Sequence, residues 1–413
     1  MGCTEEVEVD ISKKLGSIFL VSALILLGAC GGSTEPQNGG GLSDASSEEG
    51  VSLTEVVFGA HTDLTGPIAI WGVGILNGAR MRFDEANDAG GVHGRLIRYI
   101  AEDTQYQIPR AIQAGNKLIN RDKIFAMLMA VGTPTNNAVM PAQFRAGVPN
   151  LFPVTGARSM IDPFNKLMFS QMGVYYEEMR AGVKYFVEEK GYTTPCVIYQ
   201  DTEYGQEILD GVEDQVAAMG IEIAETSAHK PTDSEFTAAI IRLRNAGCDL
   251  VMMGTVHRDT ILVLEAARKA GWDNVAWVGN EAAYGRVIAE QESGSGEGYY
   301  AFVPFAVMYS DDELTPEARA WYDAYVEQHG EEPGLPAMVG YRGADLTIQA
   351  LERAGKDLTR ESFVAAMESI SEYTDLFGYT LTYGPNDHKG VDSSLLSQVQ
   401  NGRWVTLAES LSY

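Results

Sequence analysis

The sequence of 413 residues lacks the short motifs that mark common catalytic, metal and nucleotide sites. It has no His-Glu-x-x-His or Cys-x-x-Cys spacing, and its six histidines are scattered, so a sequence-local zinc site has no support. It also has no Gly-x-Ser-x-Gly nucleophile motif and no phosphate-binding loop ending in Gly-Lys-Ser/Thr. Gly72, Gly74 and Gly78 do not have the spacing of a dinucleotide-binding loop. No metal or cofactor is therefore expected, and the sequence favours binding over catalysis.

Basic residues are also scarce. The chain carries 30 Lys and Arg against 57 Asp and Glu, which gives a formal net charge of −27. Such a surface is repelled by phosphate backbones, so nucleic-acid binding is not expected. The acidity either keeps the protein in solution or forms an acidic docking face for a partner, and the sequence leaves both interpretations open.

The N-terminal segment is typical of an export signal rather than of a folded domain. Lys13 and Lys14 precede an apolar run, Ile18–Leu27, that is too short to span a bilayer but suits the core of a signal peptide. The small residues directly before Cys30 resemble the cleavage site of bacterial lipoproteins. The resemblance implies a signal peptide over residues 1–29 and lipidation of Cys30; a buried cysteine in a core helix is the alternative.

Two further features belong to this region. The four acidic residues before Lys13 depart from the positive start of a signal peptide, so the true translation start, and with it Cys3, stays open. Residues 30–52 are rich in Gly, Ser and Glu and cannot bury enough apolar surface to fold alone. We therefore expect a flexible tether over residues 30–52.

The rest of the chain alternates between strand-like and helical patterns in two series, and its length suits two domains. The expected strands cover residues 56–60, 96–101, 125–130 and 148–152, then 196–199, 221–226, 249–253 and 275–278. The expected helices cover residues 76–89, 109–120 and 135–146, then 204–219, 235–245 and 260–270. Three more helices and a strand-like stretch at 395–407 follow residue 315. This alternation predicts α/β architecture with parallel sheets.

Several motifs, in their order, resemble the periplasmic binding proteins for branched-chain amino acids and amides. The resemblance spans about Glu55 to Leu407. Its residues are Leu64-Thr65-Gly66-Pro67, Trp71-Gly72, Asn77-Gly78-Ala79, Asp84-Glu85-Ala86-Asn87, Gly90-Gly91-Val92-His93-Gly94, Gly132-Thr133-Pro134-Thr135-Asn136, Leu151-Phe152-Pro153-Val154-Thr155-Gly156-Ala157, Asp201, Tyr204-Gly205 and Gly279-Asn280-Glu281.

This family implies a type I periplasmic-binding fold, in which two doubly wound parallel-sheet domains are joined by a three-segment hinge and hold ligand in the cleft. The implied crossings lie near Gly173, Phe302 and Asp375. The N-terminal lobe would then comprise residues 53–173 plus 302–375, and the C-terminal lobe residues 174–301 plus 376–413.

The first lobe is expected to hold a ligand carboxylate. Thr133 and Pro134 are typical of a helix start, with Thr as N-cap, and a helix N-terminus presents free N–H groups to an anion. Thr155 and Ala157 would add a hydroxyl and a backbone amide at a neighbouring strand end. The alternative is that Thr133 acts only as a cap.

Aromatic side chains are expected to complete the cleft. By resemblance, Trp71, in a loop after a strand, occupies the place of an aromatic that packs on the ligand; a plain core role is the alternative. Tyr175 and Tyr204 are expected to contact ligand from the second lobe, with Tyr176 as a substitute for Tyr175. His257 either borders the pocket or lies in a surface loop, and the surface loop is favoured.

Glu281 is the residue that the resemblance links to ligand chemistry. Related amino-acid binders pair a glutamate here with the ligand ammonium, whereas relatives for amides or aromatic acids need none. A carboxylate in a closing cleft makes a strong charge-assisted hydrogen bond to an ammonium. A solvated acid at a helix start is the alternative.

Cys196 and Cys248 begin two strands that are parallel neighbours in a doubly wound sheet. The exported location implied by the lipoprotein signal is oxidising, so a disulfide between them is a hypothesis, and two buried thiols are the alternative.

The leading functional prediction is an extracytoplasmic lipoprotein, anchored to a bacterial membrane through Cys30, that binds a branched-chain or related amino acid. It would deliver this ligand to the permease of an ABC importer. A ligand sensor and a binder of amides or aromatic organic acids are the alternatives on the same fold. An exported amide or peptide hydrolase is a third class.

Overall fold

The computed structural model describes residues 48–413. The predicted signal peptide, Cys30 and most of the predicted tether lie outside the described residues. Within residues 48–413, no helix is long and apolar enough to cross a membrane.

The first lobe is built on a five-stranded parallel sheet of order β2-β1-β3-β4-β5. Its longest interior strand, β1, is buried at nearly every position, as a parallel strand covered on both faces must be. The elements are β1 (Glu55–Thr62), α1 (Ala69–Asp88), β2 (Leu96–Asp103), α2 (Ile108–Asn120), β3 (Ala126–Leu128), α3 (Thr133–Arg145), β4 (Asn150–Leu151), η1 (Arg158–Met160) and β5 (Met168–Phe169).

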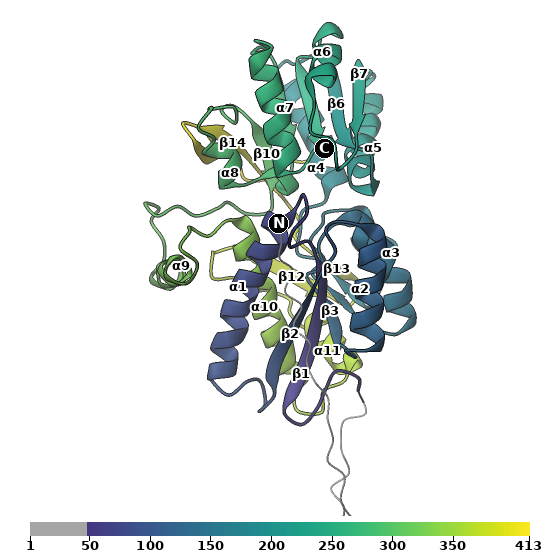
Figure 1. The fold of residues 1–413 in the computed structure, drawn as a ribbon, viewed down its shortest axis with the longest axis vertical. Coiled ribbons are helices and arrows are strands. Elements are labelled where there is room, and N and C mark those ends of the chain that lie inside the picture. Colours follow the sequence, from purple (N-terminus) through teal and green to yellow (C-terminus); the bar gives the residue numbers. More distant parts are fainter. Residues whose placement is uncertain (1–47) are drawn as a thin grey trace, which may run out of the picture. The chain divides into compact units, whose positions relative to one another are not determined.

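The second lobe repeats this order in the parallel strands β7-β6-β8-β9-β10, separately from the first sheet (Figure 1). The prediction of two doubly wound α/β lobes is therefore confirmed. The elements are α4 (Tyr175–Glu188), β6 (Pro195–Gln200), α5 (Glu203–Met219), β7 (Glu225–His229), α6 (Thr237–Asn245), β8 (Leu250–Gly254), α7 (His257–Lys269), β9 (Ala276–Gly279), η2 (Glu281–Ala283), α8 (Arg286–Ala289) and β10 (Tyr300–Val303).

The C-terminal part of the chain supplies both lobes. Its elements are α9 (Pro316–His329), α10 (Leu335–Ala354), α11 (Arg360–Glu368), β11 (Tyr373–Thr374), β12 (Thr380–Gly384), β13 (Asp387–Gly390), β14 (Leu395–Gln400) and β15 (Arg403–Ala408). The expected strand at 395–407 is a hairpin, because Asn401 and Gly402 both adopt positive φ, as a two-residue hairpin turn of type I′ requires.

Helices α1 and α10 pack side by side in the first lobe, which Figure 1 shows. Their backbones approach closely at glycines. A Cβ at Gly78 would lie 1.9 Å from the carbonyl oxygen of Ala337, and one at Gly340 would lie 2.2 Å from that of Ile75. Gly78 therefore serves helix packing here, which fits its rejection as part of a dinucleotide-binding loop.

Strands β12 and β13 lie with the first lobe. The backbone N–H of Ser170, just after β5, donates to the carbonyl oxygen of His388 at 2.8 Å. The chain returns to the second sheet only between β13 and β14, later than the crossing expected near Asp375. The physical reason is that β11–β13 pair with one another and pack beside β5, so they stay in the first lobe.

Residues 48–52, the end of the predicted tether, also contact the first lobe. Arg360 pairs with Glu48 at 3.7 Å, and Val51 forms a β-bridge with Val56. The backbone N–H of Val57 donates to the carbonyl oxygen of Gly50 at 2.8 Å.

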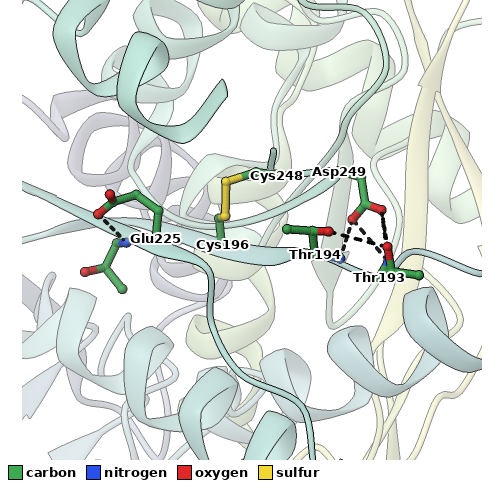
Figure 2. Close-up of a disulfide and its surroundings, with 7 residues drawn as sticks. Thr193, Thr194, Cys196, Glu225, Cys248 and Asp249 are labelled. Atoms are coloured by element: carbon green, nitrogen blue, oxygen red, sulfur yellow. Dashed lines mark hydrogen bonds between the residues drawn. A yellow bond between two sulfur atoms is a disulfide. The ribbon is translucent and has the colours of Figure 1, made fainter. Parts of the chain in front are cut away.

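A disulfide joins Cys196 in β6 to Cys248, two residues before β8 (Figure 2). Strands β6 and β8 are parallel neighbours, which brings the two cysteines to the same end of the sheet. Beside the bridge, both backbone N–H groups of Thr193 and Thr194 donate to the carboxylate of Asp249. This end of the second sheet is therefore held by a covalent link and by charge-assisted hydrogen bonds.

Candidate functional site

A small cavity of about 30 Å³ lies where the carboxyl ends of strands from both lobes meet. In open α/β sheets this edge is where ligands bind. Five of the residues expected to bind ligand line this cavity, together with eight others. The lining residues are Ile68, Trp71, Tyr106, Val131, Gly132, Thr133, Val154, Thr155, Met172, Tyr175, Tyr204, Val256 and Ala282. The cavity is narrow because aromatic side chains fill much of the space between the lobes.

The loop that follows β1 positions Trp71. The carboxylate of Asp63 accepts hydrogen bonds from the backbone N–H groups of Gly66, at 2.5 Å, and Ile68, at 2.9 Å. Asp103, at the end of β2, accepts from the backbone N–H of Leu64 at 2.9 Å. These bonds complete the turn early, so α1 begins at Ala69 and Trp71 lies in its first turn, not in a loop as expected from the sequence.

Thr133 and Thr155 form the polar side of the cavity. Their hydroxyl oxygens are 2.6 Å apart, and the backbone N–H of Ala157 donates to the hydroxyl of Thr155 at 3.2 Å. Thr133 is the first residue of α3 and not its N-cap, because Gly132 takes that position with a positive φ of 97°. The Thr133 hydroxyl thus makes no capping bond and instead faces Thr155.

Two tyrosines supply the second-lobe side. Tyr175 begins α4 and Tyr204 lies in the first turn of α5, with their ring centroids 5.2 Å apart in an edge-to-face arrangement. The Tyr204 hydroxyl donates to the carbonyl oxygen of Thr255 or to the side-chain oxygen of Asn280, at 3.0 and 3.1 Å. Burial raises the pKa of both phenols well above its ordinary value, so they act as neutral donors and packing surfaces.

The two remaining aromatic candidates lie elsewhere. The hydroxyl of Tyr176 donates to Asp214 at 2.6 Å on the exposed side of α4, so Tyr175 and not Tyr176 lines the cavity. His257 is buried at the start of α7, with its ring centroid 6.3 Å from that of Trp71, so the expected surface loop is wrong. Burial lowers the pKa of His257 to about 4 and keeps the ring neutral near pH 7.

Glu281 is fully buried in η2, immediately behind the cavity lining. Its carboxyl group lies close to Gly156 and Tyr175. A Cβ atom on Gly156 would be 3.0 Å from a carboxyl oxygen of Glu281 and 3.0 Å from the ring of Tyr175. No donor among residues 48–413 satisfies either oxygen; the group within hydrogen-bonding reach is the carboxyl of Glu178. Burial and this neighbouring acid raise the pKa of Glu281 well above its ordinary value.

Several contacts bridge the lobes around this cavity. The indole N–H of Trp71 donates to the carbonyl oxygen of Ala282 at 3.4 Å. At the rim, the guanidinium of Arg158 in η1 pairs with Glu207 at 2.8 Å and Asp210 at 2.6 Å, both on α5. The two lobes are thus in a closed arrangement that polar contacts stabilise.

Sequence reasoning missed Tyr106, Met172 and Val256 in the cavity lining. Tyr106 follows β2 and its hydroxyl reaches the side-chain oxygen of Gln200 in the other lobe at 3.4 Å. Its position just after the carboxyl end of a strand was a usable signal, because that end of a parallel sheet faces the ligand. Met172 lies in the first crossing, and no local pattern marks it.

No cluster of three or more His, Cys, Asp or Glu side chains in the described part of the chain has the arrangement of a metal site. What the cavity offers instead is a pair of hydroxyls and aromatic surfaces, with a buried carboxyl group behind its lining. These groups are suited to holding a small polar molecule.

Residues 55–403 match the family model described as periplasmic binding protein. The leucine-, isoleucine-, valine-, threonine- and alanine-binding protein of Pseudomonas aeruginosa is 26% identical over 296 residues, which cover 71% of this chain and 77% of that protein.

Solved structures have a similar fold. A fatty acid ABC transporter substrate-binding protein from Thermomonospora curvata superposes with a TM-score of 0.80 at 21% identity, covering 89% of this chain and 95% of that one. The branched-chain amino acid transporter substrate-binding protein of Streptococcus pneumoniae, in complex with isoleucine, has a TM-score of 0.73 at 19% identity, with coverages of 87% and 100%.

Proposed function

The chain belongs to the periplasmic binding protein family, and on this premise we propose that it is the solute-binding subunit of an ABC importer for a branched-chain or similar amino acid. The ligand would lie in the cleft between the lobes and pass to a permease. Members of this family are solute-binding proteins and not enzymes, so the hydrolase alternative is not pursued.

The two sides of the cleft suit the two ends of an amino acid. Thr133 and Thr155 offer hydroxyls, and the first turn of α3 has N–H groups without intrahelical acceptors; together they form a seat for a carboxylate. Glu281, in η2 of the second lobe, is buried behind the cavity lining and suits an ammonium. Trp71 and Tyr175 supply apolar surface for an aliphatic side chain.

The observation that carries this proposal is the burial of Glu281 without a donor among residues 48–413. A buried carboxyl group without a hydrogen-bond donor is costly, by about 1–3 kcal/mol or more. A ligand ammonium would supply the missing donor and the compensating charge. This is why an amino acid is favoured over a neutral amide.

Opening of the lobes is a required step in this mechanism. The cavity of about 30 Å³ does not admit a leucine-sized molecule while Trp71 and Tyr175 occupy the cleft, so the lobes must separate or the rings must move first. A ligand then favours the closed state because it contacts both lobes only there.

Delivery to a membrane partner is also part of the proposal. A lipid on Cys30, followed by a flexible segment, would keep the binding lobes beside a permease outside the cytoplasmic membrane. The acidic surface of the chain offers a charged face for such a partner.

A second candidate is a carboxylate ligand without an amine. It is favoured by the raised pKa of Glu281, because a protonated Glu281 needs no cation. The fatty acid transporter protein named above has a similar fold. In this case Thr133 and Thr155 would bind the ligand carboxylate, and Glu281 would act as a neutral hydrogen-bond donor.

Calorimetric titration of the chain without residues 1–30, unfolded and refolded to remove bound ligand, tests both candidates. The ligands are leucine, isoleucine, valine, alanine, their amine-free analogues and benzoate. One-to-one binding of an amino acid, with the amine-free analogue at least tenfold weaker, supports the proposal. Equal or tighter binding of the amine-free analogue contradicts it and favours the second candidate.

A further inference from the structure

Two buried carboxyl groups meet behind the cleft. Glu178 is in the first turn of α4 and Glu281 is in η2, so both belong to the second lobe, and they are 4% and 0% exposed. The two groups flank the contact between Gly156 and Gly173. If each glycine carried a Cβ atom, the Cβ of Gly156 would lie 3.0 Å from a carboxyl oxygen of Glu281. The Cβ of Gly173 would lie 2.2 Å from a carboxyl oxygen of Glu178. The carboxyls are within hydrogen-bonding reach of each other.

The other groups around the pair do not neutralise it. Ser394 donates to one oxygen of Glu178 at 2.5 Å, and Tyr175 faces Glu281. The charge of Lys389, on β13, acts on Glu178, but its ammonium binds Glu177 at 2.7 Å. Asp392, in the segment that leads to β14, lines the cavity beside Glu178 and adds further negative charge.

Two carboxylates cannot both ionise cheaply in such a place, because the like charges repel in a medium that solvates them poorly. Burial raises the pKa of Glu178 to about 7, and burial together with the neighbouring Glu178 raises the pKa of Glu281 well above its ordinary value. Near pH 7 the pair therefore holds at least one proton, with Glu281 neutral.

We propose that Glu178 and Glu281 form a proton-sharing pair that couples capture of an amine-bearing ligand to loss of a proton, with Glu178 as the residue that sets the coupling. This inference rests on the proposed function. When the ligand ammonium reaches Glu281, the O–H bond of that carboxylic acid breaks and the resulting carboxylate accepts an N–H hydrogen bond. The proton moves to Glu178 if that group is ionised, and to solvent if it is already protonated.

The structure provides a route for that proton on the side away from the cleft. Glu178, Lys389 and Ser394 line a surface cavity of about 260 Å³ at the hinge, so water can reach Glu178 without passing the ligand. Glu178 thus lies between the ligand site and the solvent, and it acts on the ligand only through Glu281.

The sign of the pH dependence follows from linkage. Below about pH 7 both groups hold protons before binding and one is released, so affinity for an amine-bearing ligand rises with pH by up to about tenfold per unit. Above about pH 7 Glu178 takes the proton from Glu281, little is released to solvent, and the affinity becomes nearly independent of pH.

Calorimetry with leucine in buffers of different ionisation enthalpy, from pH 5 to 8, measures the released protons directly. In the wild type the expected release approaches one proton at pH 5.5 and falls above pH 7. Glu178→Gln keeps an acceptor for Ser394 but cannot take up the proton of Glu281. Above pH 7 that proton must go to solvent, so the release at pH 7.5 should be at least twice that of the wild type, while the release at pH 5.5 should stay near one proton. Glu188→Gln, the matched control at the exposed end of the same helix, should leave the profile unchanged.

Carbon NMR of the glutamate carboxyls in the ligand-free protein distinguishes failure of the proton coupling from failure of the proposed function. In the wild type, the Glu281 carboxyl should titrate well above pH 4.5. In Glu178→Gln, the midpoint of this titration should move to lower pH. If Glu281 titrates near 4.5, or if leucine binds without releasing a proton, the inference is overturned and the proposed function stands. If no amine-bearing molecule binds, the proposed function falls and the coupling with it, even where the carboxyl titration is raised.

Discussion

The two lobes share the same order of parallel strands but bring different chemistry to the cleft. In the first lobe, the ends of β3 and β4 lead to Thr133 and Thr155, which are neutral hydroxyls paired with each other. In the second lobe, the corresponding region carries Tyr204, Glu281 and, behind them, Glu178. The repeated topology places ligand-facing residues at the same edge of each sheet, and the residues themselves decide which end of a ligand each lobe holds.

The lobes also differ in the internal contacts that stabilise each of them. The second sheet has an antiparallel hairpin, β14–β15, and a disulfide, while the first lobe relies on the close packing of α1 against α10. One architecture thus tolerates either covalent or steric reinforcement. Four predictions test these differences.

The largest expected effect comes from the disulfide. Replacing Cys196 and Cys248 together by Ser opens a link that spans 52 residues of chain, and the chain-entropy model assigns such a link about 4 kcal/mol. We expect a clear fall in the urea midpoint of the second lobe, measured by tryptophan fluorescence. Reductant should lower the wild-type midpoint and leave the double variant unchanged. Equal wild-type midpoints with and without reductant would contradict the prediction.

Glu281→Gln should abolish the preference for an amine-bearing ligand. The substitution keeps the shape of the side chain but removes the charge that would pair with the ammonium, so affinity for leucine should fall about 100-fold, or about 2.7 kcal/mol. Calorimetry measures the loss, and circular dichroism checks the fold. Glu292→Gln, at an exposed position in the same lobe, is the control. A leucine affinity within threefold of wild type would rule out this role.

The hydroxyl pair of the first lobe should have a smaller effect. Thr133→Val and Thr155→Val each remove one hydroxyl at nearly constant volume, and we expect affinity for the carboxylate-bearing ligand to fall about tenfold in each case. The fold loss of affinity in the double variant should be smaller than the product of the two single losses, because the residues contact each other. Thr226→Val, at an exposed position on β7, should bind normally. Normal binding by both cleft variants would remove the first lobe from carboxylate recognition.

The smallest effect is expected at the rim. Arg158→Gln removes two ion pairs that join the lobes, but these groups are partly exposed, so ligand should dissociate only a few-fold faster. The difference should shrink as salt screens the wild-type pairs. Stopped-flow release at two salt concentrations measures it. Lys117→Gln, which removes ion pairs within the first lobe, should release ligand at the wild-type rate. A dissociation rate unaffected by Arg158→Gln would show that closure does not depend on this contact.

The sequence patterns located most elements but not their boundaries. Strand and helix alternation predicted both lobes, because apolar runs and helical spacing are local properties. The loop character expected for Trp71 was wrong because Asp63 and Asp103, from two different strands, start α1 early. The hairpin at Asn401 and Gly402 carried a readable Asn-Gly signal that a single long strand overlooked.

In the candidate site, too, the sequence predicted which residues take part but not their local geometry. Trp71, Thr133, Thr155, Tyr175 and Tyr204 were expected from motifs and lie around one cavity; their contacts with ligand stay predictions. Thr133 was expected to cap α3, but the positive φ of Gly132 gives that position to the glycine. A cap depends on backbone dihedral angles, and residue type alone does not specify them.

By itself, the sequence determined the export-like start, the acidic balance, the two α/β series and the residue types at the strand ends. These follow from composition and from hydrophobic periodicity, which act over a few neighbouring residues. Only the tertiary structure decided that Glu178 lies beside Glu281 and that β11–β13 stay with the first lobe. Such contacts join segments far apart in the chain, and burial, which shifts the pKa of the carboxyl pair, exists only after the lobes have packed.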